Sequence, residues 1–333
     1  MSVLVLGGAG YIGSHAVHQL IDEKQHVVVV DNLSTGHRGA LHADVSFYQG
    51  DIRDIKFLRS VFEQENIESV IHFAANSLVG ESMSLPLQYF DNNVYGTQVV
   101  LQTMVEFDVK RIVFSSTAAT YGEPEQVPIT ENMPTAPTNT YGETKLTMEK
   151  MMHWTEKAHG IQFVSLRYFN VAGARASAVI GEDHRPETHL IPIILEAALG
   201  KREFISIFGD DYDTPDGTCI RDYIHVEDLI KAHLLALDYL KNGGESTVFN
   251  LGSNTGFSVK EIIEAVEKVT KQQIPTKIGE RRAGDPATLI ASSEKAKQTL
   301  NWTPTQTSIE QIIQDAWQWH TTHPDGYVEE ENK

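Results

Sequence analysis

The 333-residue sequence has little cysteine: Cys219 is the only one. A single thiol excludes an internal disulfide framework and is typical of a protein kept in a reducing compartment. The chain also lacks an apolar run of the roughly 20 residues that span a bilayer. Its first predicted strand starts at Val3, which leaves no room for a secretory leader. We therefore expect a soluble, cytoplasmic protein with no membrane partner.

Basic residues are scarce as well. The chain carries 27 Lys and Arg against 45 Asp and Glu, which gives a formal charge of -18. Such a surface repels phosphate backbones, so nucleic acid is not an expected partner. An anionic ligand would need a local site built from Arg, Lys or helix N-termini.

No repeat of fixed period is present, and the first half instead alternates short apolar runs with amphipathic stretches. This alternation predicts a parallel sheet covered by helices on both faces. The predicted strands are 3–7, 26–30, 45–48, 69–75, 111–116 and 163–169, and the helices between them are 12–23, 57–65, 87–107 and 142–158.

Beyond residue 170 the regular alternation of strands and helices ends. Helical patterns follow at 228–240, 259–270 and 308–320, separated by short strands. We predict a doubly wound α/β fold, a Rossmann-type domain over residues 1–170, and a smaller α+β substrate lobe over residues 171–333. The chain can pass from one lobe to the other more than once.

The stretch "VLVLGGAGYIGSHAVHQLI" reads as a strand, a glycine-rich turn and a helix, with Gly7, Gly10 and Gly13 spaced three apart. These glycines let the backbone approach a pyrophosphate at the helix N-terminus. Asp31 ends the second predicted strand, where an acidic side chain binds a ribose hydroxyl and repels a 2'-phosphate. The pattern favours NAD over NADP; the alternative is a tight turn in another α/β protein.

The tripeptide Tyr-Gly-Glu occurs twice, and only the second copy, in "TYGETK", has a Lys four residues after the Tyr. On a helix, Tyr141 and Lys145 share one face, so that the ammonium group can lower the pKa of the phenol and make it a general base. The first copy places Glu125 four residues after Tyr121, which would raise the pKa instead. The alternative for the second copy is a solvated surface pair.

The stretch "FSSTAATYG" ends the preceding strand and brings hydroxyl groups to the carboxyl edge of the sheet. One of Ser115, Ser116 and Thr117 could donate a hydrogen bond to a substrate oxygen. Polar capping of the strand end is the alternative for these side chains, and for Ser116 in particular.

Together, the hydroxyl group, Tyr-x-x-x-Lys and Gly-x-x-Gly-x-x-Gly resemble the extended branch of the short-chain dehydrogenase/reductase superfamily. "RYFNVAGA" (167–174), "IFGDDYDTPDGTCIRDYIHVEDL" (207–229) and "RRAGDPA" (281–287) extend the resemblance over nearly the whole chain, to the family of UDP-glucose 4-epimerases. The resemblance implies an NAD-dependent isomerase of galactose metabolism that works through a transient 4-keto sugar. Tyr141 would be the base, Lys145 would tune it and anchor the nicotinamide, and Thr117 would bind the same sugar oxygen.

The resemblance also implies the binding residues, a homodimer and no metal. The expected cofactor-binding residues are Gly7, Gly10, Tyr11, Ile12, Gly13, Asp31, Asn32, Asp51, Ile52, Phe73, Ala74, Ala75, Asn92, Ser115, Tyr141, Lys145 and Tyr168. The expected UDP-sugar-binding residues are Thr117, Tyr141, Asn170, His189, Leu190, Phe208, Arg221, Arg282, Asp285 and Leu289. Without the resemblance, Arg221 could equally pair with a neighbouring Asp, and Asn170 could be a turn residue.

Four positions depart from the commonest pattern of the family. Thr117 stands where Ser is frequent, Ser77 where some members have Lys, and His189 where an Asn often meets the substrate. Leu289 stands where a bulky Tyr narrows the sugar pocket of stricter members. This last departure favours a UDP-N-acetylglucosamine 4-epimerase, or a bifunctional enzyme, as the alternative function.

Two further alternatives follow from the same fold. A nucleotide-sugar 4,6-dehydratase shares the Tyr and Lys, but it uses an Asp-Glu pair where this chain has Ala118 and Ala119. A binding protein that senses NAD and has lost catalysis would share the cofactor site. Such proteins tend to lose the Tyr or the Lys, and this chain keeps both.

Overall fold

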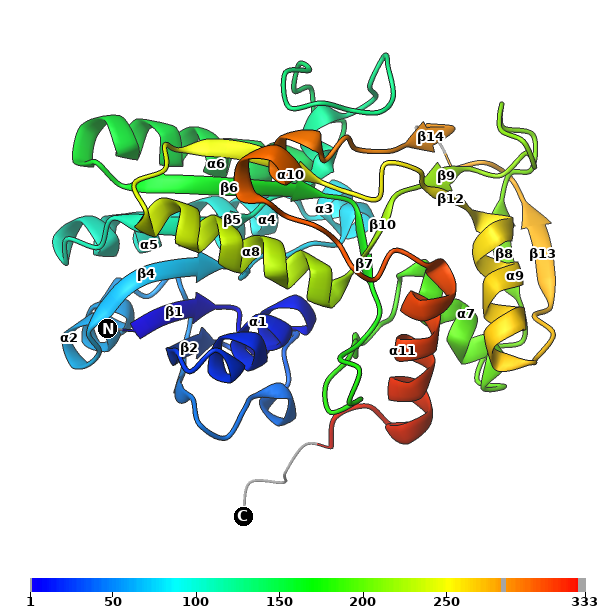
Figure 1. Cartoon of the computed structure of the whole chain (residues 1–333), viewed down its shortest axis with the longest axis horizontal. Coiled ribbons are helices and arrows are strands. Elements are labelled where there is room, and N and C mark those ends of the chain that lie inside the picture. Colours follow the sequence, from blue (N-terminus) through cyan, green and yellow to red (C-terminus); the bar gives the residue numbers. More distant parts are fainter. Residues whose placement is uncertain (1, 283–285, 329–333) are drawn as a thin grey trace.

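The computed structural model describes residues 2–282 and 286–328 (Figure 1). Its centre is a seven-stranded sheet in the order β3-β2-β1-β4-β5-β6-β11, in which every neighbouring pair is parallel. Most of these strands are apolar runs buried on both faces, as expected of a parallel sheet. The strands are β1 (Ser2–Leu6), β2 (His26–Asp31), β3 (Ser46–Gln49), β4 (Ile67–His72), β5 (Arg111–Ser115), β6 (Gln162–Tyr168) and β11 (Thr247–Leu251).

Helices cover both faces of this sheet (Figure 1). One face packs against α1 (Tyr11–Asp22), α8 (Val226–Lys241) and α10 (Glu294–Leu300), and the other against α2 (Ile55–Gln64), α5 (Gly96–Glu106) and α6 (Thr140–His159). Two separate apolar clusters result, one on each side of the sheet. The predicted doubly wound α/β class is confirmed.

The helix predicted over 87–107 consists of three consecutive pieces. It runs as α4 (Pro86–Tyr89), a π-helical segment η2 (Phe90–Tyr95) and α5. Such π-helical insertions often occur at functional sites. Short elements beside the sheet are η1 (Arg38–Ala40), α3 (Val79–Ser84) and η3 (Ala118–Tyr121).

The smaller lobe has its own apolar core, to which three helices contribute. Its helices are α7 (Leu190–Ala198), α9 (Val259–Thr270) and α11 (Ile309–Thr322), and its strands are β7 (Asn170–Ala172), β8 (Ile205–Phe208), β9 (Ile220–Arg221), β10 (Tyr223–His225), β12 (Phe257–Ser258), β13 (Thr276–Gly279) and β14 (Thr288–Leu289). The strands form three small sheets: β7 with β10, β9 with β12 and β14, and β8 with β13.

The division of the chain at residue 170 stays a prediction. Helix α8 and strand β11 follow this boundary in the sequence, yet both belong to the main sheet and its covering layer. The chain therefore crosses from the sheet to the smaller lobe more than once.

No helix within residues 2–282 and 286–328 has the length and apolar character needed to cross a bilayer.

Candidate active site

A large cleft of about 1210 Å³ lies at the carboxyl ends of the sheet strands. Its floor is formed where the strand order reverses, since β2 and β3 lie on one side of β1 and β4, β5, β6 and β11 lie on the other. Ligands of open α/β sheets bind at this switch point. Segments of the smaller lobe that carry Asn170, Arg221 and Leu289 form the opposite wall.

The glycine-rich turn between β1 and α1 requires glycine at two of its positions. Gly7 has a φ of 78°, and a Cβ atom there would lie 2.6 Å from the backbone nitrogen of Ala74. A Cβ atom at Gly13 would lie 2.0 Å from the carbonyl oxygen of Gly7. Gly10 lines the cleft and precedes α1, so the first backbone N–H groups of that helix are available to an anion.

Asp31 is held in place by two backbone N–H groups at the end of β2. Ala9 donates to its Oδ2 atom at 2.9 Å, and Leu33 donates to its Oδ1 atom at 2.8 Å. Burial raises the pKa of the Asp31 carboxyl group, and these two hydrogen bonds oppose the rise. The result is an oriented acceptor beside the glycine-rich turn, as the sequence predicts for a ribose-binding group.

The Tyr and Lys of the second Tyr-Gly-Glu copy lie on the first turns of α6 and line the cleft. Tyr141 hydrogen-bonds with Thr117, which caps η3. Lys145 donates from Nζ to the carbonyl oxygen of Ser115 at 2.7 Å, and its Nζ lies 5.9 Å from the centre of the Tyr141 ring. The three residues predicted to be catalytic are therefore brought together.

The pKa values of this pair differ from the simple expectation. Burial raises the pKa of Tyr141 to about 12, although its hydrogen bond with Thr117 opposes this shift. Burial lowers the pKa of Lys145 to about 7, and the charge of Glu149 opposes that shift. The sequence predicted that the ammonium group of Lys145 would lower the pKa of the phenol; in the structure, burial is the largest cause and raises it.

A buried polar network that the sequence reasoning missed lies beneath Lys145. Arg167 donates to Glu149 at 2.9 and 2.5 Å, and the Ser116 hydroxyl donates to Glu149 at 2.5 Å. Glu149 follows Lys145 by four residues on α6, and this spacing was the available signal. Ser116 therefore faces the network and not the cleft.

Tyr121, from the first Tyr-Gly-Glu copy, occupies a structural position. Its hydroxyl donates to Asn250 Oδ1 at 2.7 Å, and its ring lies 4.8 Å below the guanidinium group of Arg167. It does not line the cleft. The two copies of the tripeptide therefore have different surroundings, as their sequence context predicts.

Nearly all the residues predicted to bind the cofactor line the cleft; the exception is Asp51. Its carboxylate accepts hydrogen bonds from Arg53 at 2.6 and 2.9 Å, and from Asn32 at 3.3 Å. These bonds lower the pKa of Asp51 to about 2, with Arg53 the largest cause. Asp51 thus contacts Arg53 and Asn32, while the neighbouring Ile52 contributes to the wall. The cofactor-binding role of Asp51 stays a prediction.

The residues predicted to bind the UDP-sugar divide into three groups. Those that line the cleft are Thr117, Tyr141, Asn170, His189, Arg221, Arg282 and Leu289. Phe208 lies behind this wall with its ring 4.0 Å from the guanidinium group of Arg282, and Leu190 packs against the core of the smaller lobe. Asp285 lies outside the described residues, and the binding roles of all these residues stay predictions.

Arg221 has an ordered setting at the cleft wall. Its Nη1 atom donates to the carbonyl oxygens of Ile220 and Pro286, both at 2.9 Å. Asp222, which the sequence offered as an alternative partner, accepts from the backbone of Ser253 at 2.6 Å and of Ala291 at 3.0 Å.

Comparison with known proteins identifies the family of the chain. Residues 3–252 match the NAD dependent epimerase/dehydratase family. A UDP-glucose 4-epimerase of Halalkalibacterium halodurans is 60% identical over 330 residues, which make up 99% of this chain and 98% of that protein.

Two crystal structures extend the comparison. UDP-glucose 4-epimerase from Bifidobacterium longum, in complex with NAD+ and UDP, is 40% identical with a TM-score of 0.93, and the match covers 98% of this chain and 100% of that one. The UDP-Glc/GlcNAc 4-epimerase from Campylobacter jejuni is 43% identical with a TM-score of 0.85, over 96% of this chain and 99% of that one. The resemblance to UDP-glucose 4-epimerases and the fold class predicted from the sequence are confirmed.

Proposed function

Since the chain belongs to the NAD dependent epimerase/dehydratase family, we propose that it interconverts UDP-glucose and UDP-galactose as an NAD-dependent 4-epimerase of galactose metabolism. The observation that carries this proposal is the grouping of Tyr141, Thr117 and Lys145 in one cleft with the glycine-rich turn. These groups would serve as the base, the hydroxyl donor and the cofactor site of one reaction.

The residues of the first βα unit fit NAD. Gly10 and the N-terminus of α1 would hold the pyrophosphate, and Asp31 would accept from a ribose hydroxyl. When bound, NAD would take the hydride from carbon 4 of the sugar and return it to the other face, and its positively charged nicotinamide would favour the phenolate of Tyr141. The B. longum relative binds NAD+ in its crystal, which supports this cofactor.

Tyr141 would remove the proton of the sugar 4-hydroxyl and return it after the 4-keto sugar has turned. Burial works against the phenolate, and the hydrogen bond from Thr117 opposes this effect. The ammonium group of Lys145 would add to this stabilisation when it is charged. Because the pKa of Lys145 is itself lowered to about 7, the buried Glu149 helps to keep the ammonium group charged.

The smaller lobe would bind the UDP part of the substrate. Arg221 and Arg282 line the cleft wall opposite the glycine-rich turn, and planar guanidinium groups suit a diphosphate. The chain as a whole is acidic, and these two arginines give the cleft the local positive charge that an anionic ligand needs. UDP is present in the B. longum crystal, which supports this assignment.

The experiment that tests the proposal compares the two Tyr-Gly-Glu copies. We expect Tyr141→Phe to lower turnover of UDP-galactose by roughly 100- to 10,000-fold, the range for a general acid-base group, while NAD and UDP-sugar still bind. Tyr121→Phe is the matched control: it removes a buried hydroxyl from the structural network and should keep turnover near the wild-type rate. Formation of UDP-glucose without added NAD is followed by chromatography.

Two results would count against the epimerase. If wild-type protein converts no UDP-sugar even with added NAD, the binding-protein alternative takes its place. If Tyr121→Phe and Tyr141→Phe lose turnover equally while both remain folded, Tyr141 is not the base. The dehydratase alternative has no support in the cleft, where Ala118 and Ala119 offer no acid or base.

Leu289 favours a second candidate, activity on the N-acetylated UDP-sugars as well. Its side chain is partly buried and lines the cleft where a Tyr would take more room. The C. jejuni relative is named a UDP-Glc/GlcNAc 4-epimerase. UDP-N-acetylgalactosamine is therefore run in parallel, and Leu289→Tyr should reduce its conversion more than that of UDP-galactose.

A homodimer is the remaining part of the proposal. An apolar groove between α5 and α6 is lined by Leu101, Val105, Met151 and Trp154, and Trp154 is 65% exposed. A large aromatic side chain of this kind is typical of interfaces. Light scattering should give twice the mass of the chain, and Trp154→Glu should shift the protein to monomer.

The predicted cytoplasmic location is likewise proposed. It rests on the single thiol of Cys219, which fits a reducing compartment. Cell fractionation with an antibody against the chain tests it.

A further inference from the structure

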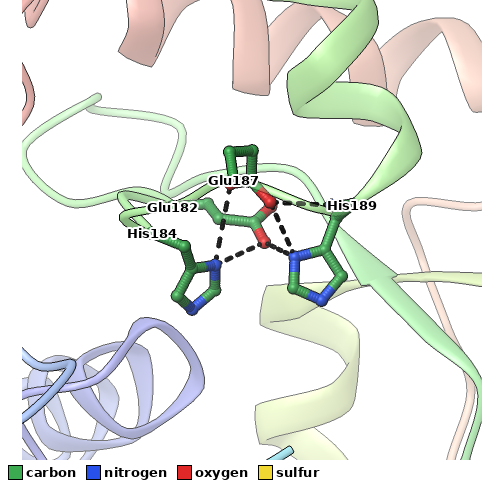
Figure 2. Close-up of side chains that lie close together, drawn as sticks. All are labelled: Glu182, His184, Glu187 and His189. Atoms are coloured by element: carbon green, nitrogen blue, oxygen red, sulfur yellow. Dashed lines mark hydrogen bonds and ion pairs between the residues drawn. The ribbon is translucent and has the colours of Figure 1, made fainter. Parts of the chain in front are cut away.

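Four side chains from one short segment converge beside the cleft: Glu182, His184, Glu187 and His189, called the tetrad below. The segment lies between β7 and α7, in the sequence "GEDHRPETHL". Figure 2 shows both imidazole rings and both carboxylates pointing to one central position. None of the four ligand atoms is more than 4.8 Å from another.

The contacts within the tetrad bring each imidazole nitrogen close to both carboxylates. Nδ1 of His184 lies 3.1 Å from Glu182 and 3.7 Å from Glu187, and Nδ1 of His189 lies 2.9 Å from each carboxylate. Each ring makes one hydrogen bond to a carboxylate, His184 to Glu182 at 3.1 Å and His189 to Glu187 at 2.9 Å. A cation between the four side chains would replace these two bonds and take one ligand atom from each residue.

The four residue types suit a tetrahedral ion with nitrogen and oxygen ligands. Zinc binds histidine nitrogen and carboxylate oxygen at about 2.0–2.2 Å, so the edges of its tetrahedron are roughly 3.3–3.6 Å long. The nitrogen-oxygen distances above, 2.9 to 3.7 Å, are near this value, although the two that reach Glu187 end on different oxygens. Because the four ligand atoms span up to 4.8 Å, the side chains would draw together around the ion. Two imidazole ligands favour zinc over magnesium or calcium, which prefer oxygen.

The surroundings hold the ligands in place. The backbone N–H groups of Thr188 and His189 both donate to Glu187 at 2.7 Å, which fixes that carboxylate. The indole N–H of Trp319 donates to the carbonyl oxygen of Glu182 at 3.0 Å, and the Tyr327 hydroxyl binds both backbone groups of Gly181 at 3.0 Å. The bonds to the Glu187 carboxylate orient one ligand group, and those of Trp319 and Tyr327 fix the backbone of the segment.

The tetrad is also accessible. Both histidine rings line the cleft, with side-chain exposures of 28% for His184 and 43% for His189, whereas the two carboxylates are buried. A cation can therefore enter from the cleft without unfolding the segment.

We propose that the tetrad binds a zinc ion, which fixes the segment between β7 and α7 at the edge of the cleft. The chain supplies all four ligands, so the ion is structural and takes no part in the reaction. This proposal replaces the sequence prediction of no metal, since two Glu and two His within eight residues are a visible signal. The proposal stands independently of the epimerase activity.

The test is zinc binding by the full chain, purified without a polyhistidine tag. The protein is stripped with a chelator, and zinc is then titrated in competition with a chromophoric chelator. We expect about one zinc per chain and a higher Tm when zinc is present. Glu187→Gln, which keeps the shape and the backbone hydrogen bonds, and His184→Asn should each weaken binding by at least roughly tenfold.

His42→Asn is the matched control, because His42 also pairs with a carboxylate, Asp44, but lies outside the tetrad. It should bind zinc as the wild type does, and magnesium should replace zinc in none of these proteins. The proposal fails if the wild type binds no zinc, or if Glu187→Gln and His184→Asn bind it as tightly as the wild type. The tetrad would then be an ion-pair network only.

Discussion

The buried imidazole of His72 should make the protein lose stability in mild acid. His72 is the last residue of β4, and its Nε2 atom hydrogen-bonds with the Thr97 hydroxyl at 3.0 Å. Burial, and to a lesser degree the charge of Lys145, lowers its pKa from 6.5 to about 3. The folded protein therefore holds this ring neutral where the unfolded chain would take up a proton.

The sign and size of the effect follow from linkage. Because the folded pKa is the lower one, stability is complete above pH 6.5 and is lost as the pH falls towards 3. One pKa unit corresponds to about 1.4 kcal/mol. Between pH 7.5 and pH 5.0, His72 alone should cost about 2 kcal/mol of unfolding free energy.

The assay is a urea titration of wild type and His72→Gln at both pH values, with the same concentration of NAD throughout. The substitution also changes the unfolding free energy by an amount that does not depend on pH. This amount cancels when each protein is compared with itself at the two pH values. His72→Gln should lose about 2 kcal/mol less than wild type between pH 7.5 and 5.0. His159→Gln, an exposed histidine at the end of α6, should behave as wild type. Equal losses for wild type and His72→Gln would refute the reasoning.

Three further outcomes are expected. Gly13→Ala should abolish copurification of NAD, because its Cβ atom would lie 2.0 Å from the Gly7 carbonyl oxygen; an unchanged NAD content in the absorbance spectrum would contradict this. Asp31→Ala should weaken NAD binding by roughly 10- to 100-fold, the value of a hydrogen bond to a charged group, and equal dissociation constants in calorimetry would contradict it. Glu149→Gln removes the charge that raises the pKa of Lys145, so the alkaline limb of kcat should move to lower pH; an unmoved limb in the pH profile would rule out this coupling.

Features set by local pattern could be predicted from the sequence. The helix predicted over 259–270 is α9, Val259–Thr270, whose amphipathic period is strong and whose start is fixed by a capping box between Ser258 and Glu261. The glycine-rich turn could also be predicted, because a side chain at Gly7 or Gly13 would clash with the backbone.

Features set by distant contacts could not be predicted from the sequence. Strand β11 pairs with β6, although about 80 residues separate them, and nothing in "TVFNL" identifies that partner. The engagement of Asp51 with Arg53 was also missed, since a carboxylate after a strand reads the same whether it faces a ligand or a neighbouring guanidinium group. Burial likewise decides the pKa of Tyr141, and sequence spacing does not report burial.

The tetrad shows how a zinc ion could alter the cleft without changing its charge. Two carboxylates raise the pKa of His184 to about 9 and of His189 to about 10 against the effect of burial, so without metal both rings are charged and the four side chains are neutral in sum. With zinc, two neutral rings, two carboxylates and one divalent ion again sum to zero. The field that Arg221 and Arg282 present to a diphosphate is therefore the same in both states. Zinc would change how firmly the His189 ring is held, and its loss should reduce stability before it reduces the attraction for the nucleotide.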